Sequence, residues 1–195
     1  MKRREKMVYT NYRKGYGNNS GISNNNYSIG MRYYKERNYA KAIEYLEKDI
    51  EENEYYRTLF TLGKCYQKTR QSKKAENAFL LVLELDSKNV YARLELGKLY
   101  AKQGKEQQAE KLFQEYMQLD PKNIHARLEL GKLYAKQGKE QQAEQLFLEC
   151  IQLDTKNVHA RLELGKLYAK QSKEKEAEKL FQEYMQLDPK NVHAR

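Results

Sequence analysis

The side chains best suited to binding a ligand are lysines that recur in pairs four residues apart. The pairs are Lys64 and Lys68, Lys98 and Lys102, Lys132 and Lys136, and Lys166 and Lys170. Residues four apart lie on one face of a helix, so parallel, stacked helices would align these pairs into a lysine ladder. Such a ladder favours an acidic segment, a terminal carboxylate or a phosphorylated peptide. We expect Arg57 and Phe60 to extend it at its start.

A plainer interpretation of the lysines stays open. Lysine is a soluble helix former, and a solvated helix face needs no partner. Glu95, Glu129 and Glu163 also lie close enough in the sequence to neutralise part of the ladder.

Histidine and cysteine give no sign of a metal or catalytic site. His125, His159 and His193 recur regularly, but copies on adjacent helices are expected about 10 Å apart, whereas zinc needs ligands ~2 Å from one point. Cys65 and Cys150 are far apart, and both are expected to fill packed positions. We therefore predict no metal, no cofactor, no catalytic residue and no enzyme activity.

An internal repeat of 34 residues explains this regularity. The sequence ARLELGKLYAKQ occurs at residues 92–103, 126–137 and 160–171, a weaker copy begins at Tyr56, and a still weaker one near Ser23. Self-similarity at such a period indicates a stack of supersecondary units. The chain has only two prolines and ten glycines, which favours helices.

Each repeat is predicted to form two helices. Gly104 stands where a left-handed cap would end the first helix, and Pro121 ends the second. Gly97 and Ala109 are expected to be the points where the two helices approach closely. Asparagines precede the first helices as expected N-caps: Asn89, Asn123, Asn157 and Asn191.

This pattern resembles the tetratricopeptide repeat (TPR) family. The matching positions in one copy are Leu96, Gly97, Tyr100, Ala109, Phe113 and Pro121, and the similarity spans roughly residues 23–191. Arginine replaces a frequent aromatic residue at Arg93, Arg127 and Arg161, and Ser87 and Thr155 replace the helix-ending proline. The resemblance implies an all-α fold: an α-solenoid, or right-handed superhelix, of stacked antiparallel helix pairs in about five units.

The same resemblance implies a non-enzymatic protein-interaction scaffold. First helices of such arrays line a concave groove that takes a peptide or a partner helix. The chaperone-binding members use a clamp with asparagine where this chain has Lys64, Lys98 and Lys132, so that activity is not expected here. The predicted partner is a protein or peptide of acidic character.

The expected boundaries are a basic N-terminal arm at 1–22, repeats at 23–55, 56–89, 90–123, 124–157 and 158–191, and the start of a truncated repeat at 192–195. We expect the arm to be disordered, because it is basic and poor in apolar residues. The glycine-rich stretch 15–21 lacks the signature of a phosphate-binding loop. The ending in mid-repeat suggests a fragment of a longer protein.

The net charge of +10 leaves a second function open. Tyrosines interleaved with basic residues in the arm could stack on single-stranded RNA or lie on an anionic membrane, and the arm and the lysine ladder together could bind RNA or another polyanion. A third hypothesis makes the repeats a regulatory or docking arm of an enzyme beyond Arg195. The sequence has no run of ~18 apolar residues and no secretory leader, and with two cysteines it is expected in the cytoplasm.

Overall fold

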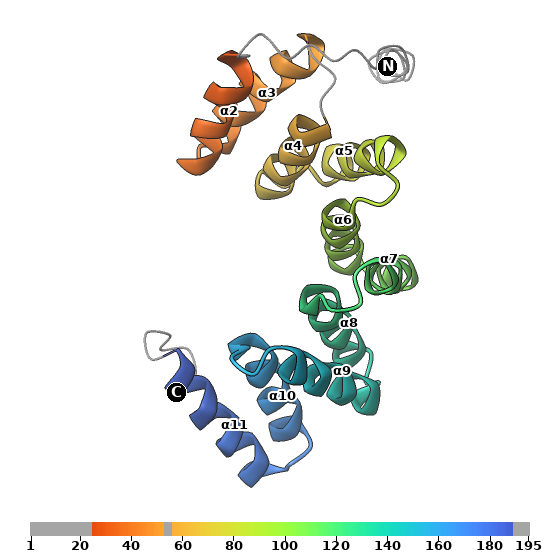
Figure 1. Ribbon diagram of the computed structural model, residues 1–195, viewed down its shortest axis with the longest axis vertical. Helices are drawn as coiled ribbons and strands as arrows, with labels where there is room; N and C mark the ends of the chain where they lie inside the picture. Colours follow the sequence, from red (N-terminus) through yellow and green to blue (C-terminus); the bar gives the residue numbers. More distant parts are fainter. Residues whose placement is uncertain (1–24, 53–55, 189–195) are drawn as a thin grey trace. The chain divides into compact units, whose positions relative to one another are not determined.

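A computed structural model describes residues 25–52 and 56–188. This part of the chain is helical throughout, in ten helices joined by short turns (Figure 1). They are α2 (Asn25–Lys35), α3 (Tyr39–Glu52), α4 (Tyr56–Lys68), α5 (Ser72–Leu85), α6 (Val90–Lys102), α7 (Glu106–Leu119), α8 (Ile124–Lys136), α9 (Glu140–Leu153), α10 (Val158–Lys170) and α11 (Glu174–Leu187). The expected all-α repeat of helix pairs is confirmed; the arm at 1–22 and the segment 192–195 lie outside the described residues.

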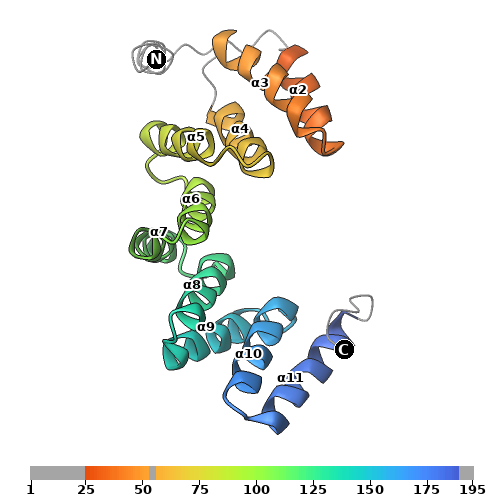
Figure 2. The same cartoon turned by 180° about the vertical axis from the view of Figure 1, so that it is seen from behind.

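The helices group into two units, Met1–Ala92 and Arg93–Arg195, with the division inside α6. In the first unit α2 packs on α3, α3 on α4, and α4 on α5. In the second unit α7 packs on α8, α8 on α9, α9 on α10, and α10 on α11 (Figure 2). None of the described helices is long and apolar enough to cross a membrane.

In four of the five described helix pairs the two helices meet at a glycine and a phenylalanine, and in the first pair Gly30 meets Leu46 instead. A Cβ atom added to Gly131 would lie 2.6 Å from Cε1 of Phe147, and one added to Gly97 would lie 2.6 Å from Cε1 of Phe113. Ala109 is fully buried. The predicted close approach at Gly97 and Ala109 is therefore correct, and it requires small residues because the facing rings are themselves packed.

The turn within each pair needs one residue in the left-handed conformation. Gly104 has φ +75° and Gly138 has φ +76°, while Ser172 takes the same position in the third copy with φ 59°. The Lys105 N–H donates to the Tyr100 carbonyl at 2.9 Å, which closes the turn as in a Schellman motif. The predicted glycine cap is confirmed.

The ends of the helices follow the sequence signals closely. Asn123 accepts a hydrogen bond from His125 N at 2.9 Å and Asn157 accepts one from Ala160 N at 2.8 Å, so both are N-caps as expected. The second helices end at Leu119 and Leu153 alike. Thr155 in place of proline therefore leaves the end of its helix unchanged.

In the three near-identical repeats, the arginine that departs from the family pattern ties the two helices of the pair together at their open end. Arg127 Nε lies 3.1 Å from Glu149 Oε2, and Arg161 Nε lies 2.9 Å from Glu183 Oε2. Arg127 lies in the first turn of α8 and Glu149 near the end of α9, which shows that the two helices are antiparallel. An ion pair thus stands where the family has an aromatic residue.

Candidate functional site

Opposite charges separate onto the first and second helices of the second unit. Each of α6, α8 and α10 carries three lysine or arginine residues and one glutamate. By contrast, α9 carries three glutamates and no basic residue. The first helices therefore carry the excess of basic residues in this unit.

In α6, α8 and α10 the first lysine of the pair lies beside a glutamate of its own helix. Lys132 Nζ is 3.1 Å from Glu129 Oε1, and the other two copies repeat this geometry. These are Lys98 with Glu95 at 3.2 Å and Lys166 with Glu163 at 3.0 Å. The expected partial neutralisation of the ladder is thus present in all three copies.

In α8 and α10 the second lysine reaches the preceding repeat. Lys136 Nζ lies 3.4 Å from Glu106 Oε1, and Gln137 Nε2 donates to Glu106 Oε2 at 3.0 Å. Lys170 and Gln171 hold Glu140 in the same way, at 3.0 Å each. Hydrogen bonds from Gln171, with help from Lys170, lower the pKa of Glu140. Sequence reasoning missed these glutamates, because their partners lie some thirty residues away.

Such pairs leave the lysines accessible. The side chain of Lys136 is 62% exposed and that of Lys170 is 61% exposed. Exposed ion pairs contribute about 0–1 kcal/mol each. A partner carboxylate can therefore compete for these lysines at little cost.

The first unit holds a different surface, centred on the predicted residues Arg57 and Phe60. Together with four further residues they line a depression of about 220 Å³, which we call the aromatic depression. Its residues are Tyr27, Arg57, Phe60, Thr61, Asn89 and Tyr91. Lys64 lies beside it, with Nζ 5.8 Å from the centre of the Phe60 ring and 5.6 Å from that of Tyr34. Lys68 is exposed at the end of the same helix.

Sequence reasoning missed four residues of the aromatic depression. Two of them were visible as departures from the repeat: Thr61 stands where Glu95 stands one repeat later, and Tyr91 where His125 stands. Tyr27 comes from α2, where the repeat is weakest.

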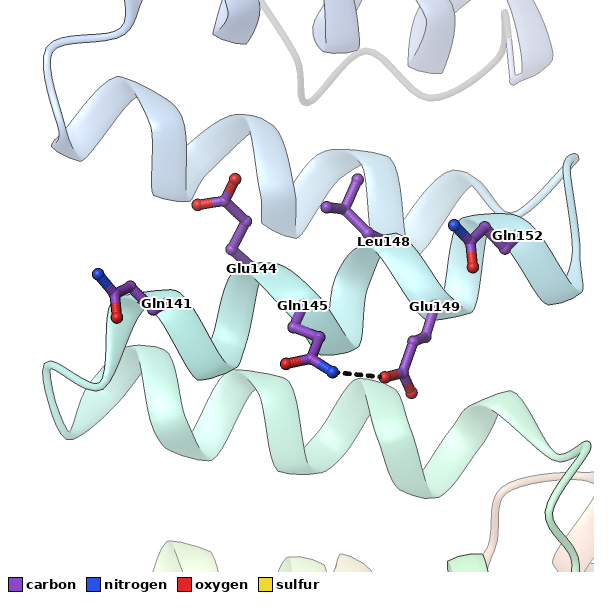
Figure 3. Close-up of a pocket in the computed structure, with 6 residues that line it drawn as sticks. All are labelled: Gln141, Glu144, Gln145, Leu148, Glu149 and Gln152. Atoms are coloured by element: carbon purple, nitrogen blue, oxygen red, sulfur yellow. Dashed lines mark hydrogen bonds between the residues drawn. The ribbon is translucent and has the colours of Figure 1, made fainter.

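A larger depression, of about 530 Å³, lies along α9 (Figure 3). All six of its lining residues come from that one helix: Gln141, Glu144, Gln145, Leu148, Glu149 and Gln152. Gln145 bonds Glu149, whose carboxylate also pairs with Arg127. Because its walls come from a single helix, this hollow has no deep interior in which to enclose a ligand.

The chemistry of enzymes and metal sites finds no support in the described residues. They contain no group of histidine, cysteine and acidic side chains able to hold a metal ion. His125 and His159 are exposed, and His193 lies outside the described part. Burial raises the pKa of the Cys65 and Cys150 thiols to about 11, the opposite of what a nucleophile needs.

Two descriptions of known protein families match parts of this sequence. The description "Cilia and flagella-associated protein 70 middle TPR-like domain" matches residues 94–195, which is more than half of the chain. The description "Tetratricopeptide repeat" matches residues 60–124. No curated protein matches the chain.

Solved structures share the fold at low sequence identity. A thermophilic TPR protein in Thermus thermophilus has a TM-score of 0.73 at 20% identity, over 88% of this chain and 94% of that one. A tetratricopeptide repeat protein from Parabacteroides merdae has a TM-score of 0.74 at 20% identity, over 87% and 68%. YrrB, described as a TPR protein with an unusual peptide-binding site, has a TM-score of 0.64 at 18% identity, over 87% and 88%.

Proposed function

The chain belongs to the tetratricopeptide repeat family, and from that premise we propose that it is a non-enzymatic scaffold that binds an acidic peptide or partner helix on its first helices. Proteins of this family are generally interaction scaffolds without catalytic activity. YrrB, which shares the fold, is described as having a peptide-binding site. The free thiols of Cys65 and Cys150 agree with a place in the cytoplasm.

One observation carries the acidic character of the partner. The same basic residues recur on α6, α8 and α10 while the second helices collect glutamates. Repetition on one face gives a charged strip, and charge complementarity governs the rate and selectivity of association. Because the ion pairs of the exposed Lys136 and Lys170 are weak, a partner's carboxylates can replace Glu106 and Glu140 there.

Neutralising the strip tests this proposal. A variant with Lys98, Lys102, Lys132 and Lys136 each changed to Gln should lose its partners in an affinity purification from the native cell. Glutamine is preferred to glutamate, because a negative charge beside Glu106 or Glu129 would disturb the fold. Circular dichroism should show unchanged helicity.

Second-helix lysines provide the matched control. A variant with Lys111, Lys175 and Lys179 changed to Gln should retain the partners that the first-helix variant loses. The proposal is wrong if both variants keep the same partners, or if only the second-helix variant loses them.

A further inference from the structure

The aromatic depression has the size of a site for one side chain. Its volume is about 220 Å³, below the ~300–1,000 Å³ typical of sites that enclose a whole small molecule. Rings from Tyr27, Phe60 and Tyr91 contribute to its wall. The Phe60 ring also packs on Phe79, with ring centres 5.8 Å apart, so this part of the wall is held by the core. The Phe60 side of the depression is therefore fixed, and the rings suit the depression to an apolar group.

The polar side chains of the depression are largely engaged within the protein. Thr61 Oγ1 donates to the Arg57 carbonyl at 2.9 Å. Asn89 Oδ1 accepts from Ala92 N at 3.0 Å and its Nδ2 donates to Asp86 Oδ2 at 3.1 Å. The three rings and the positive charge of Arg57 complete the wall of the depression.

Positive charge flanks the aromatic depression, and none of its six lining residues is acidic. Arg57 stands about one turn before Phe60 on α4, and Lys64 stands about one turn after it. In the later first helices the position of Thr61 is a glutamate that pairs with the following lysine. Replacing that glutamate by threonine leaves α4 without this local negative charge. Tyrosine and arginine are also the residue types most enriched where binding energy concentrates.

We propose that the aromatic depression binds an apolar side chain of an acidic peptide, with Arg57 and Lys64 facing the peptide's carboxylates. This inference rests on the proposed function and deepens it, because it puts a selective contact for the peptide in the first unit. The planar guanidinium of Arg57 can receive a carboxylate through two parallel hydrogen bonds. The rings select an aromatic or branched aliphatic side chain beside it.

A peptide fits this surface better than a nucleic acid does. A single strand of RNA needs a cationic track along its phosphates as well as rings for its bases. In the later first helices that track is interrupted by Glu95, Glu129 and Glu163, each within 3.2 Å of a lysine.

The repeat itself supplies the variant that tests the proposal. Changing Phe60→Leu, Thr61→Glu and Tyr91→His gives α4 and α6 the residues found at the same positions of α8, namely Leu128, Glu129 and His125. These residues are accommodated by the same helix pairing in the second unit, so the triple variant should fold. Its helicity and unfolding midpoint verify this.

The probe is a displayed library of random peptides, selected on the full chain alone. We expect enrichment of peptides that combine an aromatic or branched aliphatic residue with adjacent Asp or Glu. A fluorescein-labelled peptide of the enriched sequence should bind the triple variant at least about tenfold more weakly. Replacing its apolar residue by Ala should weaken binding to the parent chain by a similar factor.

A control at the equivalent position of α8 makes the result specific. His125→Ala should leave the affinity for the labelled peptide unchanged. The inference is overturned if no peptide is enriched, if the enriched peptides are basic or lack an apolar residue, or if the triple variant binds them as the parent does. It is equally overturned if the parent chain binds single-stranded oligouridylate, or a second copy of itself, and the triple variant does not.

Failure of this inference is distinguishable from failure of the proposed function. If the scaffold function is right and the depression is not its pocket, the triple variant keeps its cellular partners while the first-helix lysine variant loses them. If the scaffold function fails, both variants behave as the parent does.

Discussion

The hydroxyl of Tyr134 donates a 2.7 Å hydrogen bond to Glu110 Oε1, which joins the first helix of one repeat to the second helix of the repeat before it. Tyr168 and Glu144 form the same bond at 2.7 Å one repeat later. Burial, with the Glu144 carboxylate adding to it, raises the pKa of Tyr168 to about 12, so the phenol stays a donor at neutral pH. The motif tyrosine therefore links repeats as well as packing within them.

Removing that hydroxyl should weaken the joint. Tyr134→Phe is expected to lower the free energy of unfolding by about 1 kcal/mol, because one hydrogen bond is lost while the ring still packs. Urea unfolding followed by circular dichroism measures the loss. Tyr91→Phe, on an exposed ring, should have no effect, and equal stabilities of the two variants would contradict the role of the joint.

The features of the fold that lie within a single 34-residue repeat were predictable from the sequence. Gly97, Gly104 and Asn123 each have a local reason for their place: a close contact, a left-handed turn and an N-cap. Local signals of this kind recur with the 34-residue period and reinforce one another. The helix pairs follow from them directly.

The contacts between repeats were not predictable in the same way. Lys136 was assigned to an open ladder, yet it lies 3.4 Å from Glu106 on the preceding helix. Nothing in the local sequence pairs residues that far apart, because the contact depends on how successive helices stack. The aromatic depression was not predicted, for the opposite reason. Thr61 and Tyr91 differ from the residues at the same positions of later repeats, and a search for periodicity emphasises the residues that the repeats share.

Serine substitutions at two glycines distinguish the free-energy cost of disturbed side-chain packing from the cost of a left-handed backbone. Gly131→Ser should cost at least about 2 kcal/mol, because its Cβ would lie 2.6 Å from the buried Phe147 ring. Gly138→Ser should cost only about 1 kcal/mol, since its Cβ meets no atom within 4 Å and only the left-handed backbone opposes it. Ser172 already occupies the equivalent position. Equal losses in thermal unfolding would contradict this assignment.

The arginine that replaces the family aromatic should contribute through its ion pair. A double-mutant cycle of Arg127→Met and Glu149→Gln is expected to give a coupling energy of about 1 kcal/mol, since the Arg127 side chain is only 14% exposed. The same cycle on Lys48 and Glu44, where both side chains are more than half exposed, should give a clearly smaller coupling energy, because solvent screens this pair. Similar values for the two pairs would show that burial does not strengthen the Arg127 contact.

The two cysteines should be inert in the folded chain and reactive once it unfolds. Burial raises the pKa of both thiols from 9.0 to about 11, and Cys65 and Cys150 are no more than 1% exposed. Near neutral pH the thiolate, which is the reacting form, is therefore scarce and covered. Ellman's reagent should modify the native chain slowly and the urea-unfolded chain quickly, with Cys65→Ala and Cys150→Ala assigning each thiol.

The same thiols should make the free energy of unfolding fall as the pH rises. Because the folded-state pKa lies above the unfolded one, their contribution to stability is complete below pH 9.0 and is lost as the pH rises through about 11. Urea midpoints measured across this range should fall less steeply for the Cys65→Ala, Cys150→Ala double variant than for the parent chain. Parallel curves, or native thiols that react at neutral pH as fast as unfolded ones, would show that the thiols are not buried in the folded protein.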